Sequence, residues 1–214
     1  MHLELAYAPN TCALVPYVLL AEAGADFTPR PLDFRRREHL SPEFLALNPK
    51  HKVPVLIIDG EPLTESVAIG VWIARTFPAA RLLPADPKEE LRALSLMAWC
   101  ASTIHPTLTP NALPQRYCDL PGSEESVRRC AQKLTHEHYA IGERLLAGRD
   151  FFFDHLTCPD VHFFWCFRRG MQFGMDVSAY PSCRAAFDRI AARPSVQRLL
   201  AHEASVLAAQ QQAS

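Results

Sequence analysis

The hydrophobic pattern over residues 1–77 switches between the two-residue period of a strand and the 3.6-residue period of a helix. His2–Tyr7 alternates polar and apolar positions and predicts a first strand. The apolar positions within Leu14–Leu19 recur at helical spacing, and Gly24 stands where this helix would end. Phe27–Asp33 predicts a second strand, and its two prolines indicate an edge strand or an irregular one.

The remainder of this region completes a mixed α/β unit. Pro42–Leu47 predicts a short helix, and Val53–Ile58 and Glu61–Leu63 predict two strands joined by an Asp-Gly hairpin turn. A further helix is expected over Glu65–Phe77. The predicted order is therefore β-α-β-α-β-β-α, which is the order of the thioredoxin fold.

Strand patterns fade after a proline-rich segment at residues 78–87, which we interpret as a linker. The helical patterns beyond it lie at residues 88–108, 124–147, 157–173, 180–192 and 194–208. The sequence thus predicts an α/β thioredoxin-like domain at 1–77, a linker at 78–87 and an all-α domain at 88–214.

Composition narrows the classes of partner. The 214 residues are 49% hydrophobic and carry 22 Lys and Arg against 23 Asp and Glu, a net charge of −1, so disorder is excluded. Nothing forms the concentrated basic field that a nucleic acid or a membrane surface would require. The N-terminus lacks a signal-peptide pattern, and no apolar run reaches the roughly 18 residues of a membrane span. We therefore expect a cytoplasmic protein whose partner is a small molecule or a second copy of itself.

The seven cysteines are scattered along the chain, which is typical of reduced thiols rather than of a disulfide scaffold. Cys158, His162 and Cys166 recur at i, i+4 and i+8, a spacing that a zinc site could use, but no fourth ligand is visible. Thr157 and Asp160 have the spacing of a capping box, and four aromatic residues fill the same helix. We therefore interpret this segment as a core helix and expect no metal.

Several segments resemble the cytosolic glutathione transferases. They are NPKHKVPVL (Asn48–Leu56), LTESVAIGVWIA (Leu63–Ala74) and TCPDVHFF (Thr157–Phe164), followed by a later ARPSVQRLL. The opening YAPNTCALVPYVLLAEAG (Tyr7–Gly24) resembles the bacterial beta class, which places a cysteine at this point. The resemblance covers nearly the whole chain and implies the glutathione transferase architecture, glutathione as co-substrate, a role in detoxification and a homodimer.

The resemblance also implies how glutathione would bind. The start of a helix at Glu65-Ser66 offers backbone N–H groups to a carboxylate, while the Glu65 carboxylate would face the γ-glutamyl amine. The alternative is that Thr64 caps this helix and Glu65 only complements its dipole. Val53-Pro54 resembles the family's cis-proline turn, whose backbone holds the cysteinyl part of glutathione, and the alternative is an ordinary trans proline.

Two basic residues are candidates for the glycine carboxylate of glutathione. Arg37, in the run Arg35–Arg37, matches by position a basic residue of the beta class, and Lys52 lies close by in the sequence. The alternative for such a run is a solvated surface.

Cys12 and His105 are the predicted catalytic residues. Cys12 lies just before the first helix, whose dipole favours a thiolate, and the alternative is a buried free cysteine. His105 matches a histidine that the beta class places over the glutathione sulfur, although a single helical histidine is more often structural. Tyr7 and Thr11 are expected helpers, and Ser102, in the same segment as His105, is a further expected glutathione contact.

The chain departs from the beta-class pattern at three positions. Ala13 replaces a serine that often follows the cysteine, Asn10 replaces a frequent glycine, and Ala98 replaces an asparagine seven residues before the histidine. Thr11 is the candidate for a compensating hydroxyl.

The function implied is conjugation of the glutathione thiolate to a small apolar electrophile held in a pocket between the domains. One alternative is glutathione-dependent thiol–disulfide exchange, in which Cys12 itself forms the mixed disulfide. Another is a non-catalytic ligand-binding member of the fold. Isomerase and dehalogenase activities occur on the same scaffold and stay open, as does the identity of the electrophile.

Overall fold

The computed structural model describes residues 1–212 and divides the chain into two compact units. One unit holds Met1–Leu83 together with the segment that begins at Ala192, and the other holds Pro84–Ala191. The predicted division placed everything after residue 87 in the helical domain, so the two differ in the position of the last helix. The reason is that helical periodicity reveals an apolar face but does not tell which domain covers it.

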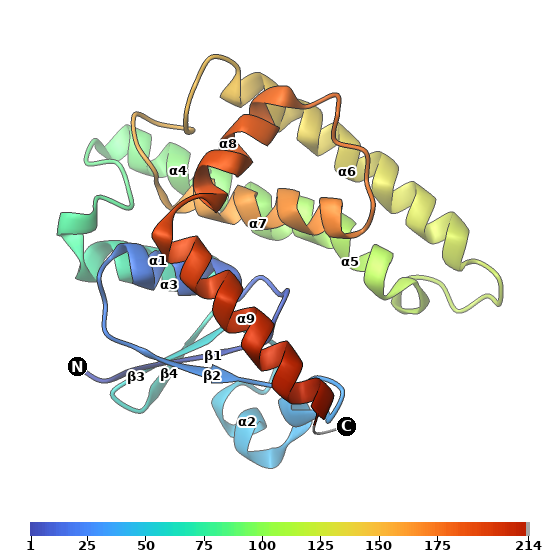
Figure 1. Ribbon diagram of the computed structural model, residues 1–214, viewed down its shortest axis with the longest axis horizontal. Helices are drawn as coiled ribbons and strands as arrows, with labels where there is room; N and C mark the ends of the chain where they lie inside the picture. Colours follow the sequence, from blue (N-terminus) through green and yellow to red (C-terminus); the bar gives the residue numbers. More distant parts are fainter. Residues whose placement is uncertain (213–214) are drawn as a thin grey trace. The chain divides into compact units, whose positions relative to one another are not determined.

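The N-terminal unit is built on one four-stranded sheet (Figure 1). Its strands are β1 (Leu3–Tyr7), β2 (Thr28–Pro31), β3 (Val55–Ile58) and β4 (Glu61–Thr64), in the spatial order β2-β1-β3-β4. β1 and β2 are parallel and the other pairs are antiparallel. The helices α1 (Leu14–Glu22), α2 (Pro42–Leu47) and α3 (Ser66–Thr76) complete the predicted β-α-β-α-β-β-α order, which is confirmed.

Burial explains the strand patterns of this sheet. Leu5 pairs with Leu56 across the antiparallel ladder, and the central strands β1 and β3 are buried on both faces, including Ala6 and Ile57. β2 lies at one edge of the sheet, as its two prolines predicted, because proline cannot donate to a neighbouring strand. Figure 1 shows α1 and α3 on one side of the sheet and α2 on the other.

The second unit is all-α. Its helices are α4 (Pro87–Trp99), α5 (His105–Ala112), α6 (Glu124–Leu146), α7 (Cys158–Gln172) and α8 (Pro181–Ala191). A π-helical turn at Cys100–Ile104 separates α4 from α5, where a single helix over 88–108 was predicted. Short 3₁₀ turns lie at Glu38–Leu40, Pro78–Ala80 and Pro114–Arg116.

The helix α7 forms the core of this second unit. Every residue of Cys158–Phe167 is buried, which confirms the interpretation of the segment as a core helix. The capping box predicted at its start is also confirmed. The Thr157 backbone N–H and hydroxyl donate to Asp160 Oδ2 at 2.8 and 2.7 Å. The buried Asp160 also accepts from the Phe152 N–H at 2.8 Å, so the start of α7 is fixed to the preceding loop.

The last helix, α9 (Pro194–Gln212), packs on α1 and belongs to the N-terminal unit. It extends four residues beyond the predicted end at 208. Within residues 1–212, no helix combines the length and the apolar character that crossing a membrane would need.

Candidate functional site

The loop between β1 and α1 carries Cys12 on a sequence of tight turns. The Thr11 N–H and hydroxyl both donate to the Ala8 carbonyl, at 3.3 and 2.7 Å, and the Thr11 carbonyl accepts from the Leu14 N–H at 3.2 Å. Asn10 adopts a left-handed conformation with φ of 62°, which asparagine tolerates better than most residues. The loop therefore presents Cys12 directly before the first turn of α1.

The Cys12 thiol lies against two other elements of the same unit. Its Sγ donates to the Val53 carbonyl at 3.6 Å. The thiol also forms a hydrogen bond with the Ser66 hydroxyl, at the start of α3. Burial raises the pKa of Cys12 to about 11, although the hydrogen bond with Ser66 and the charge of Lys52 act to lower it. Desolvation, the largest influence on this pKa, thus opposes the thiolate that the helix dipole would favour, and the catalytic role of Cys12 stays a prediction.

Val53 and Pro54 join through a cis peptide bond, which confirms the expected cis-proline turn. The turn is held by Asn48, which is only 1% exposed and which the sequence reasoning missed. Asn48 Nδ2 donates to the Lys52 carbonyl at 2.7 Å, directly before Val53. The available signal was an asparagine directly after the predicted helix Pro42–Leu47, although the sequence does not show that its amide is buried and must find hydrogen-bond partners.

Glu65 precedes α3 in a strained conformation, with φ of 72° and ψ of 119°. Its carboxylate pairs with the Lys50 ammonium, which also donates to Thr64 Oγ1 at 2.9 Å, and the Glu65 side chain is 70% exposed. The alternative that Thr64 caps α3 is wrong, since Glu65 occupies the N-cap position and no side chain in the described part of the chain caps this helix. The first N–H groups of α3 are therefore available to an anion.

The basic residues of the N-terminal unit differ in their pairing. Arg35 pairs with Asp33 at 3.5 Å, and Arg36 with Glu38 at 4.0 Å. Arg37 is exposed and adopts a left-handed conformation with φ of 58°. Lys52 is also exposed, and its charge reaches the Cys12 thiol.

Tyr7 does not fit its expected role as a glutathione helper. Its ring is 0% exposed and contacts Tyr17 and His202 at centroid distances of 5.8 and 5.7 Å. Burial, with the charge of Glu203, raises the pKa of Tyr7. The sequence does not show that α9 covers this end of β1.

The Thr11 hydroxyl, the candidate to compensate for the missing serine, makes its hydrogen bonds within the loop. It donates to the Ala8 carbonyl at 2.7 Å and accepts from the Ala13 N–H at 3.3 Å, so it closes the loop on itself. Thr11 therefore supports the conformation of the loop.

His105 and Ser102 lie in the second unit, at the π-helical turn between α4 and α5. The His105 ring meets Trp165 of α7 edge-on at 4.5 Å. The Ser102 hydroxyl donates to the Ala98 carbonyl at 2.7 Å. The expected contacts of His105 and Ser102 with glutathione stay predictions.

Comparison with known proteins adds the decisive observation. The family described as "Glutathione S-transferase, N-terminal domain" matches residues 5–75. The solved structure of a sphingomonad glutathione S-transferase complexed with glutathione is 32% identical, with a TM-score of 0.83, over 94% of this chain and 98% of that one. The chain belongs to the glutathione transferase family.

Two further relatives of this glutathione transferase bear on its class. A bacterial beta class glutathione S-transferase from Sphingomonas chungbukensis is 32% identical, with a TM-score of 0.82, and covers 94% of this chain and 98% of its own. The maleylacetoacetate isomerase of Pseudomonas aeruginosa is 30% identical over 203 residues, which are 93% of this chain and 94% of that protein. The predicted family is confirmed, as is the fold class of a thioredoxin-like sheet domain with a mostly helical remainder.

Proposed function

We propose that this glutathione transferase binds glutathione on its N-terminal unit and conjugates the glutathione thiolate to small apolar electrophiles. The observation that carries the proposal is that the loop before α1, the cis-proline turn and the start of α3 come together at the Cys12 thiol. Cys12 contacts the carbonyl before the cis-proline and the hydroxyl of Ser66 at the uncapped start of α3. A tripeptide with an anionic end and a central thiol needs these receptors side by side.

Each part of glutathione has a receptor in this arrangement. The N–H groups at Ser66 and the helix dipole of α3 take the γ-glutamyl carboxylate, and Glu65 takes the amine. The Val53 backbone beside Pro54 takes the cysteinyl part. Arg37 and Lys52 are the proposed partners of the glycine carboxylate, because both are exposed cations on this unit.

The burial of Cys12, which raises the pKa of its thiol, favours one of two kinds of chemistry. A neutral thiol is a donor that stabilises the glutathione thiolate, which then attacks the electrophile. Thiol–disulfide exchange would instead need Cys12 itself as a thiolate nucleophile, and burial opposes that state. We therefore favour conjugation with Cys12 as a binding group, and we retain His105 as the second group at the sulfur on the family resemblance alone.

The similarity to a maleylacetoacetate isomerase supports a second candidate function. In such a reaction glutathione would act catalytically and emerge unchanged, whereas conjugation consumes it. The beta-class membership, a cytoplasmic location and a homodimer complete the proposal, and light scattering in solution tests the last of these.

The test measures turnover and the fate of glutathione together. The protein is incubated with reduced glutathione and a panel of aryl halides, enones and cis-enones, and the products are identified by mass spectrometry. A thioether adduct with loss of free thiol supports conjugation, while an isomerised enone with glutathione unchanged supports the isomerase. Glutathione binding without turnover of any member would leave a non-catalytic ligand-binding protein and contradict the proposal.

A further inference from the structure

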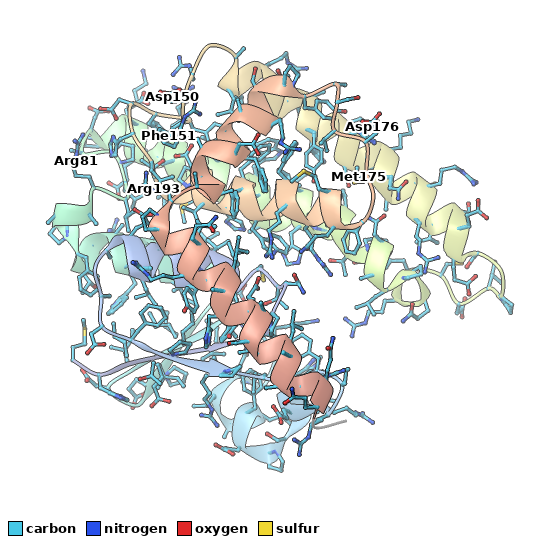
Figure 2. The ribbon with its side chains drawn as sticks, viewed as in Figure 1. Arg81, Asp150, Phe151, Met175, Asp176 and Arg193 are labelled. Atoms are coloured by element: carbon cyan, nitrogen blue, oxygen red, sulfur yellow. The ribbon has the colours of Figure 1, made fainter. Side chains whose placement is uncertain are left out.

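The C-terminal helix α9 is anchored to the N-terminal unit at its start. Both terminal oxygens of Glu22, at the end of α1, accept from the Arg193 guanidinium at 2.7 Å, and the Ser195 hydroxyl donates to the same carboxylate. Figure 2 shows Arg193 where α9 begins. Such a bidentate pair fixes the angle at which the helix leaves the preceding loop.

The buried face of α9 is apolar except for Ser195 at its start and one carboxylate in its middle. Val196, Leu199 and Val206 are buried at helical spacing, and Glu203 lies in the same stripe with only 3% of its surface exposed. A buried carboxylate is costly unless it is hydrogen-bonded. A charged residue in the buried stripe therefore indicates a specific partner on the opposite element.

That partner is the loop that carries Cys12. Glu203 Oε1 accepts from the Asn10 backbone N–H at 2.7 Å, across 193 residues of sequence. Asn10 holds the left-handed conformation of the loop and stands two residues before Cys12. The Thr11 turn uses the next N–H and not this one, so Glu203 holds the loop at a separate point.

We propose that Glu203 is a positioning residue, which holds the Asn10 backbone from α9 and thereby sets the place of the Cys12 thiol. The effect of Glu203 on turnover rests on the proposed glutathione conjugation. The effect on the position of the Cys12 thiol does not, because the loop and its hydrogen bond to Glu203 form without any ligand. The same contact makes α9 a functional part of the N-terminal unit.

The main variant is Glu203→Met, which removes the acceptor but keeps the length and an apolar packing surface. Glu203→Gln keeps a carbonyl acceptor at the same place and is the conservative rescue. Arg193→Met loosens α9 at its other anchor and leaves the Asn10 contact in place, so it controls for general destabilisation.

The first readout is alkylation of Cys12 by iodoacetamide at pH 8, followed by peptide mass spectrometry, with the exposed Cys130 as internal reference. We expect Glu203→Met to speed alkylation of Cys12 at least about threefold relative to Cys130, because release of the loop exposes more of the half-buried thiol. Glu203→Gln and Arg193→Met should both stay near the wild-type rate. An unchanged rate in Glu203→Met, or an equal increase in Arg193→Met, would overturn the proposal.

The second readout separates this inference from the proposed function. With an active electrophile, Glu203→Met should lower kcat about tenfold, as expected for loss of a hydrogen bond to a charged group, while the Kd for glutathione changes less than about twofold. If the wild type does not turn over, conjugation fails but the alkylation result still decides the positioning role. If Glu203→Met does not fold, amide hydrogen exchange of the wild type decides instead: protection of the Asn10 N–H is expected, and fast exchange contradicts the inference.

Discussion

The protonation of Cys12 is the most quantitative prediction of this structure. With the pKa raised to about 11, the thiolate fraction at pH 7.5 is about 3 × 10⁻⁴. An ordinary cysteine with a pKa of about 8.5 is roughly 9% ionised at that pH, which is about 300-fold more. The thiolate of the weaker acid is the better nucleophile by about tenfold over this difference, so Cys12 should react about 20- to 30-fold more slowly than an ordinary thiol.

The assay is the rate of iodoacetamide alkylation at Cys12 between pH 6.5 and 10, measured by peptide mass spectrometry against a cysteine-containing model peptide. The rate should rise about tenfold for each pH unit without a plateau up to pH 10, since the thiol stays below its pKa throughout. In denaturant the difference from the model peptide should disappear. A plateau below pH 8 would refute the reasoning, because it would mean that a dipole or a cation outweighs the burial of the thiol.

Variants of the residues around Cys12 show whether each one raises or lowers the pKa of its thiol. Lys52→Met and Ser66→Ala should slow the alkylation further, because both groups lower the pKa of Cys12. Glu65→Gln should speed it slightly, since the Glu65 charge raises that pKa. A change in the opposite direction for any of the three would show that the groups facing the thiol have been misassigned.

Two other predictions concern single ion pairs and caps. Lys50→Met should strengthen glutathione binding about two- to fivefold in calorimetry. The reason is that the Lys50 ammonium pairs with the Glu65 carboxylate, which the γ-glutamyl amine would use. Weaker binding by Lys50→Met would contradict this and would make Lys50 part of the glutathione site. Burial raises the pKa of Asp160 to about 6, above its value in the unfolded chain. The protonated carboxyl therefore stabilises the folded state, and this contribution to the free energy of unfolding is lost as the pH rises from about 4 through 6. Urea unfolding at pH 4.5 and 7 should therefore show that the wild type loses stability relative to Asp160→Asn at the higher pH, and parallel behaviour of the two proteins would contradict this.

The sequence predicted most of the local structure because strands, helices and caps leave recognisable patterns among residues that are close in the sequence. The strand β1 showed an alternating pattern and β3 a continuous apolar run, and the prolines of Thr28–Pro31 correctly indicated an edge strand. Thr157 and Asp160 identified the start of α7, since a capping box depends only on residues three apart. These features are local, and a single sequence contains the information for them.

The features that the sequence does not show depend on contacts between distant segments. The dipole at Cys12 is visible in the sequence, but the burial that raises the pKa of the thiol and its contact with the Val53 carbonyl are not. Tyr7 was proposed as a helper because nothing local shows that α9 covers it. Glu203 did leave a signal, a carboxylate within the apolar stripe of Val196, Leu199 and Val206, although its partner could not be read from the stripe.

The central claim is that glutathione binds at the start of α3 through Glu65. Isothermal titration calorimetry with reduced glutathione tests it most directly, on the wild type, on Glu65→Ala and on Glu61→Ala as a matched control from an exposed position of β4. Saturable binding by the wild type and by Glu61→Ala, with affinity at least about tenfold weaker in Glu65→Ala, is the predicted result. Equal affinity in all three proteins, or no binding by the wild type, would contradict the account.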